Sequence, residues 1–293
     1  MSDIQKDKSF NDRVGLGWRP EIGVRILEQL DEIDIIEIVA ENCMHLSNSG
    51  LKVFNRLSSQ VDIVVHAVSL GLASTYAVSS KHLEAVARVV HAIEPEAWSE
   101  HLAFVRTTDR ELGHLAAPPW SEETVENTLR NIQVAAKTIG SLPHLENIAT
   151  LYHPIGSTMS EADWTTEIIK GARTKLLIDL ENIYANSRNF KTQWLAEMLK
   201  FPLAEVTYVH IAGGRVATDE AGEYFLDDHL HPVAEEVYTL LEELASRVPQ
   251  PLSVILERDG NYPEFEQTRH ELVEARKSLR RGRKRQEIKN NAC

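Results

Sequence analysis

The sequence predicts a single-domain α/β fold, a (β/α)8 or TIM barrel, on two observations. Eight short apolar or β-branched segments recur along the 293 residues, and amphipathic helical segments separate them. Strands that alternate with helices form parallel sheets, and strands that are apolar on both faces favour closure into a barrel. An open, doubly wound sheet is the structural alternative. The expected strands are 14–18, 33–41, 61–69, 97–104, 142–149, 175–183, 206–213 and 252–259.

The charge is unevenly distributed, which bears on domain organisation and on partners. Residues 276–293 carry eight Lys and Arg and one Glu, a net +7, in a chain of net charge −13. The remaining acidic body repels phosphate backbones, so nucleic acid is not an expected partner. We expect an N-terminal extension over 1–12, the catalytic barrel over 13–275 and a basic tail over 276–293. The tail is expected to be frayed and solvated, although its charge would also suit an acidic partner.

Hydropathy and cysteine content limit the class of protein. No apolar segment reaches the ~18 residues that a transmembrane helix needs, and the polar segment MSDIQKDKSF does not resemble a signal peptide. We therefore expect a cytoplasmic protein that does not associate with membranes. Cys43 and Cys293 are too few for a thiolate cage, so a bound metal would need nitrogen and oxygen ligands.

Polar and ionisable side chains stand at the ends of nearly all the expected strands. They are Glu41 and Asn42, His66, Glu100 and His101, Glu146 and Asn147, Asp179, Glu181 and Asn182, His210, and Glu257, Arg258 and Asp259, with Asp227, His229 and His231 in the loop after strand seven. Any one of them would more often be a packing or capping residue. The strand ends of a barrel meet at one mouth, however, and burying so many carboxylates together is costly unless cations neutralise them. The recurrence therefore predicts a metal site at the C-terminal mouth.

The ligand types restrict the metal without deciding it. Imidazole and carboxylate without thiolate suit iron, manganese or zinc, and carboxylates able to bridge favour two or three ions over one. Iron(II) with open positions reacts with dioxygen, whereas zinc would activate water for hydrolysis.

Taken in order, the motifs resemble those of the multinuclear non-haem iron-dependent oxidative enzymes of the MbnB and TglH type (the MNIO family). They run from VGLGWRP to ERDGNYP and include EIVAEN, VVHAVSL, SEHLAF, LENIATLY, MSEADW, LIDLENIYANSRN, VHIAGG, DDHLHPV and LERD. The resemblance implies iron ligands at His66, His101, Glu146, Asp179, Asn182, His210, Asp227, His229 and Glu257. It also implies that Glu146 bridges two ions and that Asp259 is a candidate proton acceptor.

Three departures from the family pattern concern the rest of the site. Many relatives have a histidine where this chain has Gly214, an aspartate where it has Leu230 and a tryptophan where it has Arg258. These changes leave a two-iron core intact and bear on whether a third ion is bound.

The resemblance also implies a reaction and its partners. Two or three iron ions in a mixed Fe(II)/Fe(III) state are the expected cofactor, and dioxygen is the co-substrate. The expected substrate is a ribosomally synthesised precursor peptide whose cysteine thiolate binds iron, which fixes its β-carbon C–H bond beside the oxidant. A small partner protein that recognises the leader peptide is a further expectation.

Two other functions use the same residues. A zinc- or manganese-dependent hydrolase or isomerase of the endonuclease-IV or sugar-isomerase barrel class shares the fold and the ligand types. A non-catalytic barrel that binds a peptide or a partner would need no complete ligand set. Metal identity and dioxygen dependence separate these functions.

Overall fold

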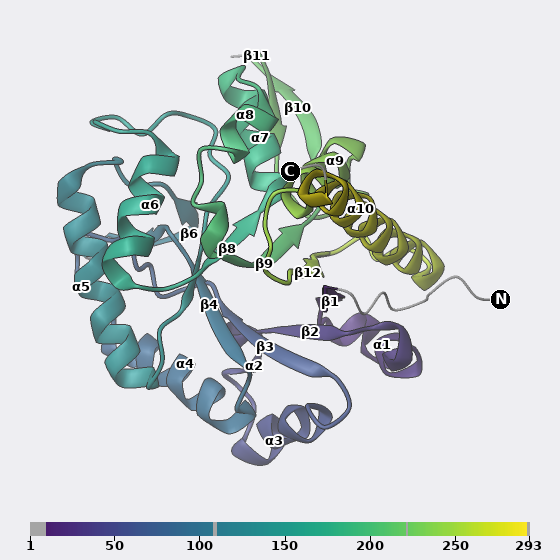
Figure 1. Ribbon diagram of the computed structural model, residues 1–293. Helices are drawn as coiled ribbons and strands as arrows, with labels where there is room; N and C mark the ends of the chain where they lie inside the picture. Colours follow the sequence, from purple (N-terminus) through teal and green to yellow (C-terminus); the bar gives the residue numbers. More distant parts are fainter. Residues whose placement is uncertain (1–9, 108–109, 221, 292–293) are drawn as a thin grey trace.

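The eight expected strands form a closed parallel barrel. In the computed structural model, which describes residues 10–107, 110–220 and 222–291, the strands close in the order β1-β12-β9-β8-β7-β4-β3-β2. They are β1 (Arg13–Gly17), β2 (Ile35–Val39), β3 (Asp62–Ala67), β4 (Ala97–His101), β7 (His144–Glu146), β8 (Leu176–Asp179), β9 (Val206–Ile211) and β12 (Ser253–Leu256). The first and last strands pair from Arg13↔Ser253 to Leu16↔Leu256. The prediction of a TIM barrel is thus confirmed (Figure 1).

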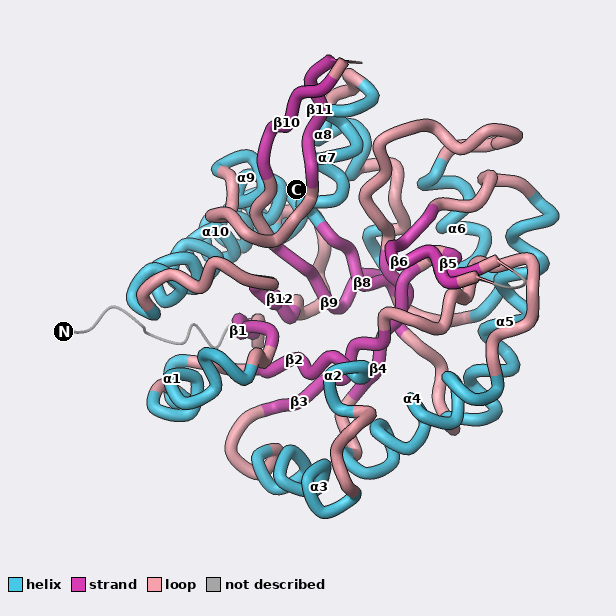
Figure 2. Tube along the Cα trace, turned by 180° about the vertical axis from the view of Figure 1, so that it is seen from behind, coloured by secondary structure: helices cyan, strands magenta, loops and turns pink. Residues whose placement is uncertain are grey.

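Helices surround the strands and two hairpins extend from the loops. The helices are α1 (Gly23–Glu28), α2 (Ala40–Cys43), α3 (Asn48–Leu57), α4 (Ser80–Ile93), α5 (Glu122–Ile139), α6 (Glu161–Ala172), α7 (Leu180–Phe190), α8 (Trp194–Met198), α9 (Glu235–Ala245) and α10 (Phe265–Asn291). The hairpins, which the sequence did not predict, are β5 (Phe104–Arg106) with β6 (Glu111–Ala116), and β10 (Arg215–Asp219) with β11 (Gly222–Leu226). The β10–β11 hairpin projects from the body of the barrel (Figure 2). None of the described helices is long and apolar enough to cross a membrane.

The inward-facing side chains change character along the barrel axis. Ile35, Val64, Leu177, Tyr208 and Ile255 form one buried apolar cluster inside the barrel. Because side chains on a strand alternate between its two faces, the residue two positions onward also points inward, one layer nearer the C-terminal mouth. In these five strands that residue is Glu37, His66, Asp179, His210 or Glu257. An apolar layer therefore closes the barrel beneath a polar layer.

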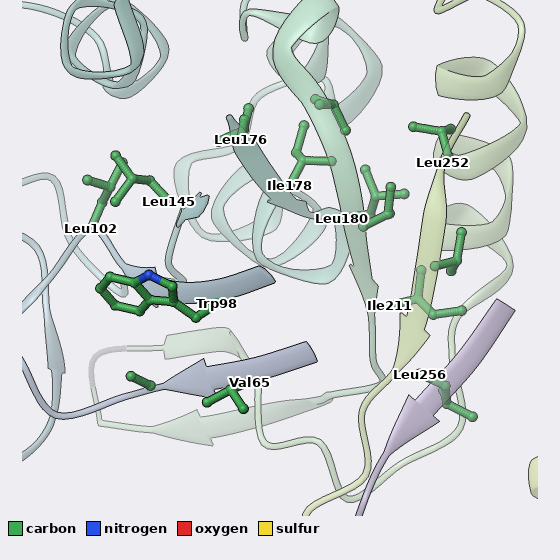
Figure 3. Packing of buried hydrophobic residues seen from close by; sticks show 14 of the residues in the cluster. Val65, Trp98, Leu102, Leu145, Leu176, Ile178, Leu180, Ile211, Leu252 and Leu256 are labelled. Atoms are coloured by element: carbon green, nitrogen blue, oxygen red, sulfur yellow. The ribbon is translucent and has the colours of Figure 1, made fainter. Parts of the chain in front are cut away.

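The outward-facing side chains of the same strands build the main hydrophobic core. Figure 3 shows Val65, Trp98, Leu145, Ile178 and Ile211, all of which belong to the large buried cluster. These residues alternate with the inward-facing ones and meet the surrounding helices. The strands are consequently covered on both faces, as the near-continuous apolar segments of the sequence predicted.

Several strands end earlier than predicted because a helix begins at the mouth. The expected strand over 175–183 stops at Asp179, whose carboxylate accepts a hydrogen bond from the backbone N–H of Asn182 (2.7 Å) and so caps α7. The expected strand over 33–41 stops at Val39 for the same reason, since α2 starts at Ala40. Each early end leaves polar residues in the first helical turn, close to the mouth.

The expectation of a frayed tail is wrong over the described residues. Residues 276–291 continue α10, which packs along α9, and only 292–293, with Cys293, lie outside the description. The guanidinium of Arg283 is buried and contacts the Asp12 carboxylate (2.6 Å) and the carbonyls of Ala245 and Gln250. Arg276 likewise contacts Asp34, and Arg281 and Arg285 contact Glu242, so much of the positive charge of this segment is paired within the chain. Of the extension expected over 1–12, residues 1–9 lie outside the description.

Candidate metal centre

The polar layer of the barrel holds two groups of side chains with converging ligand atoms. Among the described residues, His66, His101 and Glu146 form one group, and Glu146, Asp179, His210 and Glu257 form the other. Within each group the ligand atoms lie within 4.8 Å of one another, and all of these side chains are buried. The structure therefore brings together six of the nine predicted ligands.

The first group places two imidazoles against one carboxylate oxygen. Oε2 of Glu146 lies 3.5 Å from Nε2 of His66 and 3.4 Å from Nε2 of His101. This oxygen has no hydrogen-bond partner. Nδ1 of His66 lies 2.8 Å from the Ser99 hydroxyl, so a separate contact occupies the other ring nitrogen. The three atoms that remain face one another, which is the arrangement that a cation between them would use.

The second group surrounds the other oxygen of the same carboxylate. Nδ1 of His210 lies 3.0 Å from Oε1 of Glu146 and 3.1 Å from Oε2 of Glu257. Oδ2 of Asp179 is buried and has no hydrogen-bond partner, because the other oxygen makes the capping bond to α7. Glu146 is thus common to both groups and turns one oxygen toward each.

Three further predicted ligands lie beside these groups and are not members of either. Nε2 of His229 and Oδ1 of Asp227 are 2.9 Å apart, yet neither atom has a hydrogen-bond partner. Oδ1 of Asn182 is likewise buried without a partner. His229 has a φ of +54°, a left-handed backbone conformation that costs free energy in a residue other than glycine. The loop that carries Asp227 and His229 therefore holds two atoms able to bind a metal ion that make no hydrogen bond within the protein.

Burial and neighbouring charges shift the pKa values of these side chains strongly. Burial raises the pKa of Asp179 well above its usual value, and the nearby charges of Asp227 and Glu146 raise it further. Burial alone would lower the pKa of His210, but Glu257 and its neighbouring carboxylates outweigh this effect and raise it. Positive charge placed among these buried carboxylates is therefore favourable.

The donor set fits metal ions bound by nitrogen and oxygen. Unpartnered buried oxygens are rare in folded proteins because each costs roughly 1–3 kcal/mol. Here Glu146, Asp179, Asn182 and Asp227 each retain one. Cations held in the two ligand groups would satisfy the oxygens of Glu146 and Asp179. The buried clusters could therefore bind metal ions, and Glu146 could bridge two of them.

Asp259 lies at the mouth in a setting that weakens it as a base. Its carboxylate contacts the guanidinium of Arg19 (2.5 Å) and Nδ1 of His229 (3.1 Å). Burial would raise the pKa of Asp259, but His229 and Arg19 lower it below its usual value. While both contacts persist, Asp259 accepts protons poorly and holds the imidazole of His229 in place.

Sequence reasoning missed two participants in this centre. Glu37 is fully buried, and its Oε2 lies 2.9 Å from Nε2 of His210. The available signal was a lone acid in the apolar segment IIEIV, because a charge at the centre of a doubly buried strand needs a partner. Arg19 has no such signal, since its partner Asp259 lies 240 residues away in the sequence.

Comparison with known proteins identifies the family. Residues 13–280 match the family model described as RiPP precursor modification enzyme MbnB/TglH/ChrH. The chain belongs to this family. The matched segment includes all the barrel strands and both ligand groups, so the resemblance seen in the motifs is confirmed.

Individual relatives agree with this assignment. A UPF0276 protein of Streptomyces avermitilis is 34% identical over 274 residues, which are 90% of this chain but 54% of the relative, so the chain spans about half of that protein. The UPF0276 protein of Bordetella pertussis is 30% identical over 86% of this chain and 87% of its own length.

Solved structures show the same fold at low sequence identity. D-psicose 3-epimerase from Clostridium cellulolyticum superposes with a TM-score of 0.60 at 11% identity, over 92% of this chain and 98% of the epimerase. 3-keto-D-glucoside 4-epimerase from E. coli gives a TM-score of 0.56 at 12% identity, over 91% of this chain and 99% of that enzyme. At such identities the likeness concerns the barrel alone.

Proposed function

We propose that this chain is a multinuclear non-haem iron enzyme that uses dioxygen to oxidise cysteine residues of a ribosomally synthesised precursor peptide. The observation that carries the proposal is the shared carboxylate. Glu146 belongs to both groups of ligand atoms, and a carboxylate in this position can bridge two ions. Family membership supports the peptide substrate, since the family model describes enzymes that modify RiPP precursors.

In this proposal nine residues hold two or three iron ions. His66 and His101 would hold one ion, Asp179, His210 and Glu257 would hold a second, and Glu146 would contribute to both. Asn182, Asp227 and His229 complete the set and would hold a third ion if one binds. Bound iron would supply a site for the cysteine thiolate and for the reduction of dioxygen to two waters, which takes four electrons and four protons from the substrate.

The protein's own side chains prepare the site for this reaction. The apolar cluster of Ile35, Val64, Leu177, Tyr208 and Ile255 closes the barrel beneath the ligands, so substrate has to enter from the mouth. Burial of the ligands keeps bulk water away from the oxidising centre. Asp259, at the mouth, is the proposed acceptor of the proton that the substrate loses, a role that requires its contact with Arg19 or His229 to loosen.

The partners in this proposal are a cysteine-containing precursor peptide and a small protein that recognises its leader. Family membership motivates both, and a peptide reaching the mouth would pass the loops that follow the strands.

Metal analysis coupled to a peptide assay tests the proposal. The protein would be produced with added iron and examined by elemental analysis and Mössbauer spectroscopy. It would then be mixed with a cysteine-containing precursor encoded near its gene, with and without dioxygen. We expect two or three irons per chain and a dioxygen-dependent mass change that a Cys→Ser peptide lacks. Zinc or manganese in place of iron, with no dioxygen uptake, would contradict the proposal and favour a hydrolase or an isomerase.

A further inference from the structure

Glu37 makes a contact that the proposed ligand set does not explain. It stands at the centre of β2, and its side chain and that of His210 are both fully buried. Its Oε2 lies 2.9 Å from Nε2 of His210, while its Oε1 has no hydrogen-bond partner among the described residues. The imidazole of His210 therefore lies between Glu37 on one side and the carboxylates of Glu146 and Glu257 on the other.

The two contacts of the imidazole decide which tautomer could bind a metal ion. A nitrogen that binds a metal ion offers its lone pair, so in a neutral imidazole the other nitrogen carries the proton. If Nδ1 is the ligand, Nε2 carries that proton, and the Glu37 carboxylate 2.9 Å away accepts its hydrogen bond. Nδ1 faces the oxygens of Glu146 and Glu257 at 3.0 and 3.1 Å. A lone pair and two carboxylate oxygens repel one another unless a cation or a proton lies among them.

We propose that Glu37 is a positioning residue that holds His210 in the tautomer whose Nδ1 binds the metal ion of the second group. This inference rests on the metal centre in the proposed function. A carboxylate behind a ligating imidazole fixes the orientation of the ring and increases its basicity. The two nitrogens of the ring point in different directions, so Glu37 acts through His210 and is not itself a ligand of the same ion.

In the other three histidines of the proposed ligand set, one ring nitrogen contacts a weaker hydrogen-bond acceptor than Glu37. His66 contacts the neutral hydroxyl of Ser99 (2.8 Å), and Nδ1 of His101 is 3.6 Å from the carboxylate of Glu100, beyond hydrogen-bond distance. His229 contacts Asp259, which Arg19 partly neutralises. The Glu37 side chain combines a short contact, full burial and no other hydrogen bond or ion pair among the described residues. Its removal should therefore affect one metal ion much more than the other.

Metal titration of Glu37→Gln and Glu37→Ala tests this inference. Co(II) binding would be followed by visible absorption and Fe(II) binding by anaerobic calorimetry. Glutamine can still accept the Nε2–H bond but carries no charge, whereas alanine removes the acceptor. We expect affinity for one of the two ions to fall about 10-fold in the Gln variant and about 100-fold in the Ala variant. The other ion should bind within about 2-fold of the wild-type affinity, and only one set of Co(II) bands should shift.

Glu96→Gln is the matched control. Glu96 precedes β4 at the opposite end of the barrel, where its carboxylate contacts Arg13 and Tyr208. This variant removes a carboxylate from the exposed N-terminal end of the barrel without touching the centre, so it should lower thermal stability and leave both metal affinities unchanged.

The outcomes separate this inference from the function on which it rests. If wild-type protein binds neither Co(II) nor Fe(II), the metal centre itself is refuted. If wild-type protein binds two ions and both Glu37 variants match it, only the role of Glu37 is overturned. Equal loss of both ions, with stability lowered as in Glu96→Gln, would also overturn it, because a general loss of structure would then explain the effect.

Discussion

Replacing Glu146 with glutamine removes the negative charge of the one carboxylate that the two ligand groups share. One carboxylate oxygen faces His66 and His101 at 3.5 and 3.4 Å, and the other faces His210 at 3.0 Å. Glutamine keeps the size of the side chain but loses its charge. The substitution should therefore weaken the binding of both ions, whereas His101→Gln should weaken only the ion of the first group.

The expected size of the effect follows from ligand-binding linkage. An ion present at 1,000 times its Kd stabilises the fold by ~4.1 kcal/mol. If losing a ligand raises the Kd about 100-fold, that stabilisation falls to ~1.4 kcal/mol, a loss of ~2.7 kcal/mol per ion. Glu146→Gln should therefore lose ~5.4 kcal/mol of metal-dependent stability and His101→Gln about half as much. For a chain of this size, these losses correspond to Tm decreases of about 11 °C and about 5 °C.

Thermal unfolding with and without Fe(II), under anaerobic conditions, measures both losses directly. Elemental analysis at a lower free Fe(II) concentration, about 10 times the wild-type Kd, should show nearly two ions per chain in the wild type, about one in His101→Gln and fewer than one in Glu146→Gln, because a site whose Kd is raised 100-fold is then only about 9% occupied. The bridging role would be refuted if Glu146→Gln kept two ions under these conditions, or if its metal-dependent Tm shift matched that of His101→Gln.

Three further predictions concern the rest of the molecule. Burial raises the pKa of the Glu161 carboxyl from 4.5 to about 8, so its contribution to the free energy of unfolding is fully present below pH 4.5 and is lost as the pH rises to 8. In urea unfolding between pH 5 and 8, the free energy of unfolding should fall with pH more steeply in the wild type than in Glu161→Gln, by up to about 1.4 kcal/mol per pH unit, and an equal pH dependence of the two proteins would contradict this. Arg283→Met should cost roughly 3–5 kcal/mol in chemical denaturation because it leaves Asp12 without its buried partner, while the exposed Lys284→Ala should cost less than about 0.5 kcal/mol; equal costs would refute the buried role. Gly214→Ala should lower the Tm, since its Cβ would lie 2.2 Å from the carbonyl oxygen of Leu226 and displace the β10–β11 hairpin; a variant as stable as the wild type would show that this contact can relax.

Much of the fold and of the centre could be predicted from local patterns. Each of the eight apolar segments forms a barrel strand. Helix α5 begins directly after Ser121 and ends directly before Gly140, as a capping serine and a terminating glycine predict. His66, Asp179 and the four other residues of the two ligand groups converge because parallel strands in a barrel share one mouth. That convergence is a property of topology, and the alternation of strands and helices is enough to reveal it.

The remaining features depend on pairings between distant segments. Glu37 and His210 are 173 residues apart in the sequence, and no local pattern shows that β2 and β9 face each other across the barrel. The ordered end of α10 was missed because its charge suggested solvation. Its buried face is nevertheless regular, with Leu272, Ala275 and Leu279 at helical spacing.

The closure of the barrel between β1 and β12 has a consequence for when the centre can assemble. β12 pairs with β1 on one side and with β9 on the other, and Glu257 follows β12 directly. A growing chain on the ribosome therefore holds the histidines of β3 and β4 long before it holds the last carboxylate. Until β12 is made, the barrel cannot close between β1 and β9. The second ligand group is incomplete until then, so an ion that binds there, as the proposed function requires, can be held only after Glu257 has been synthesised.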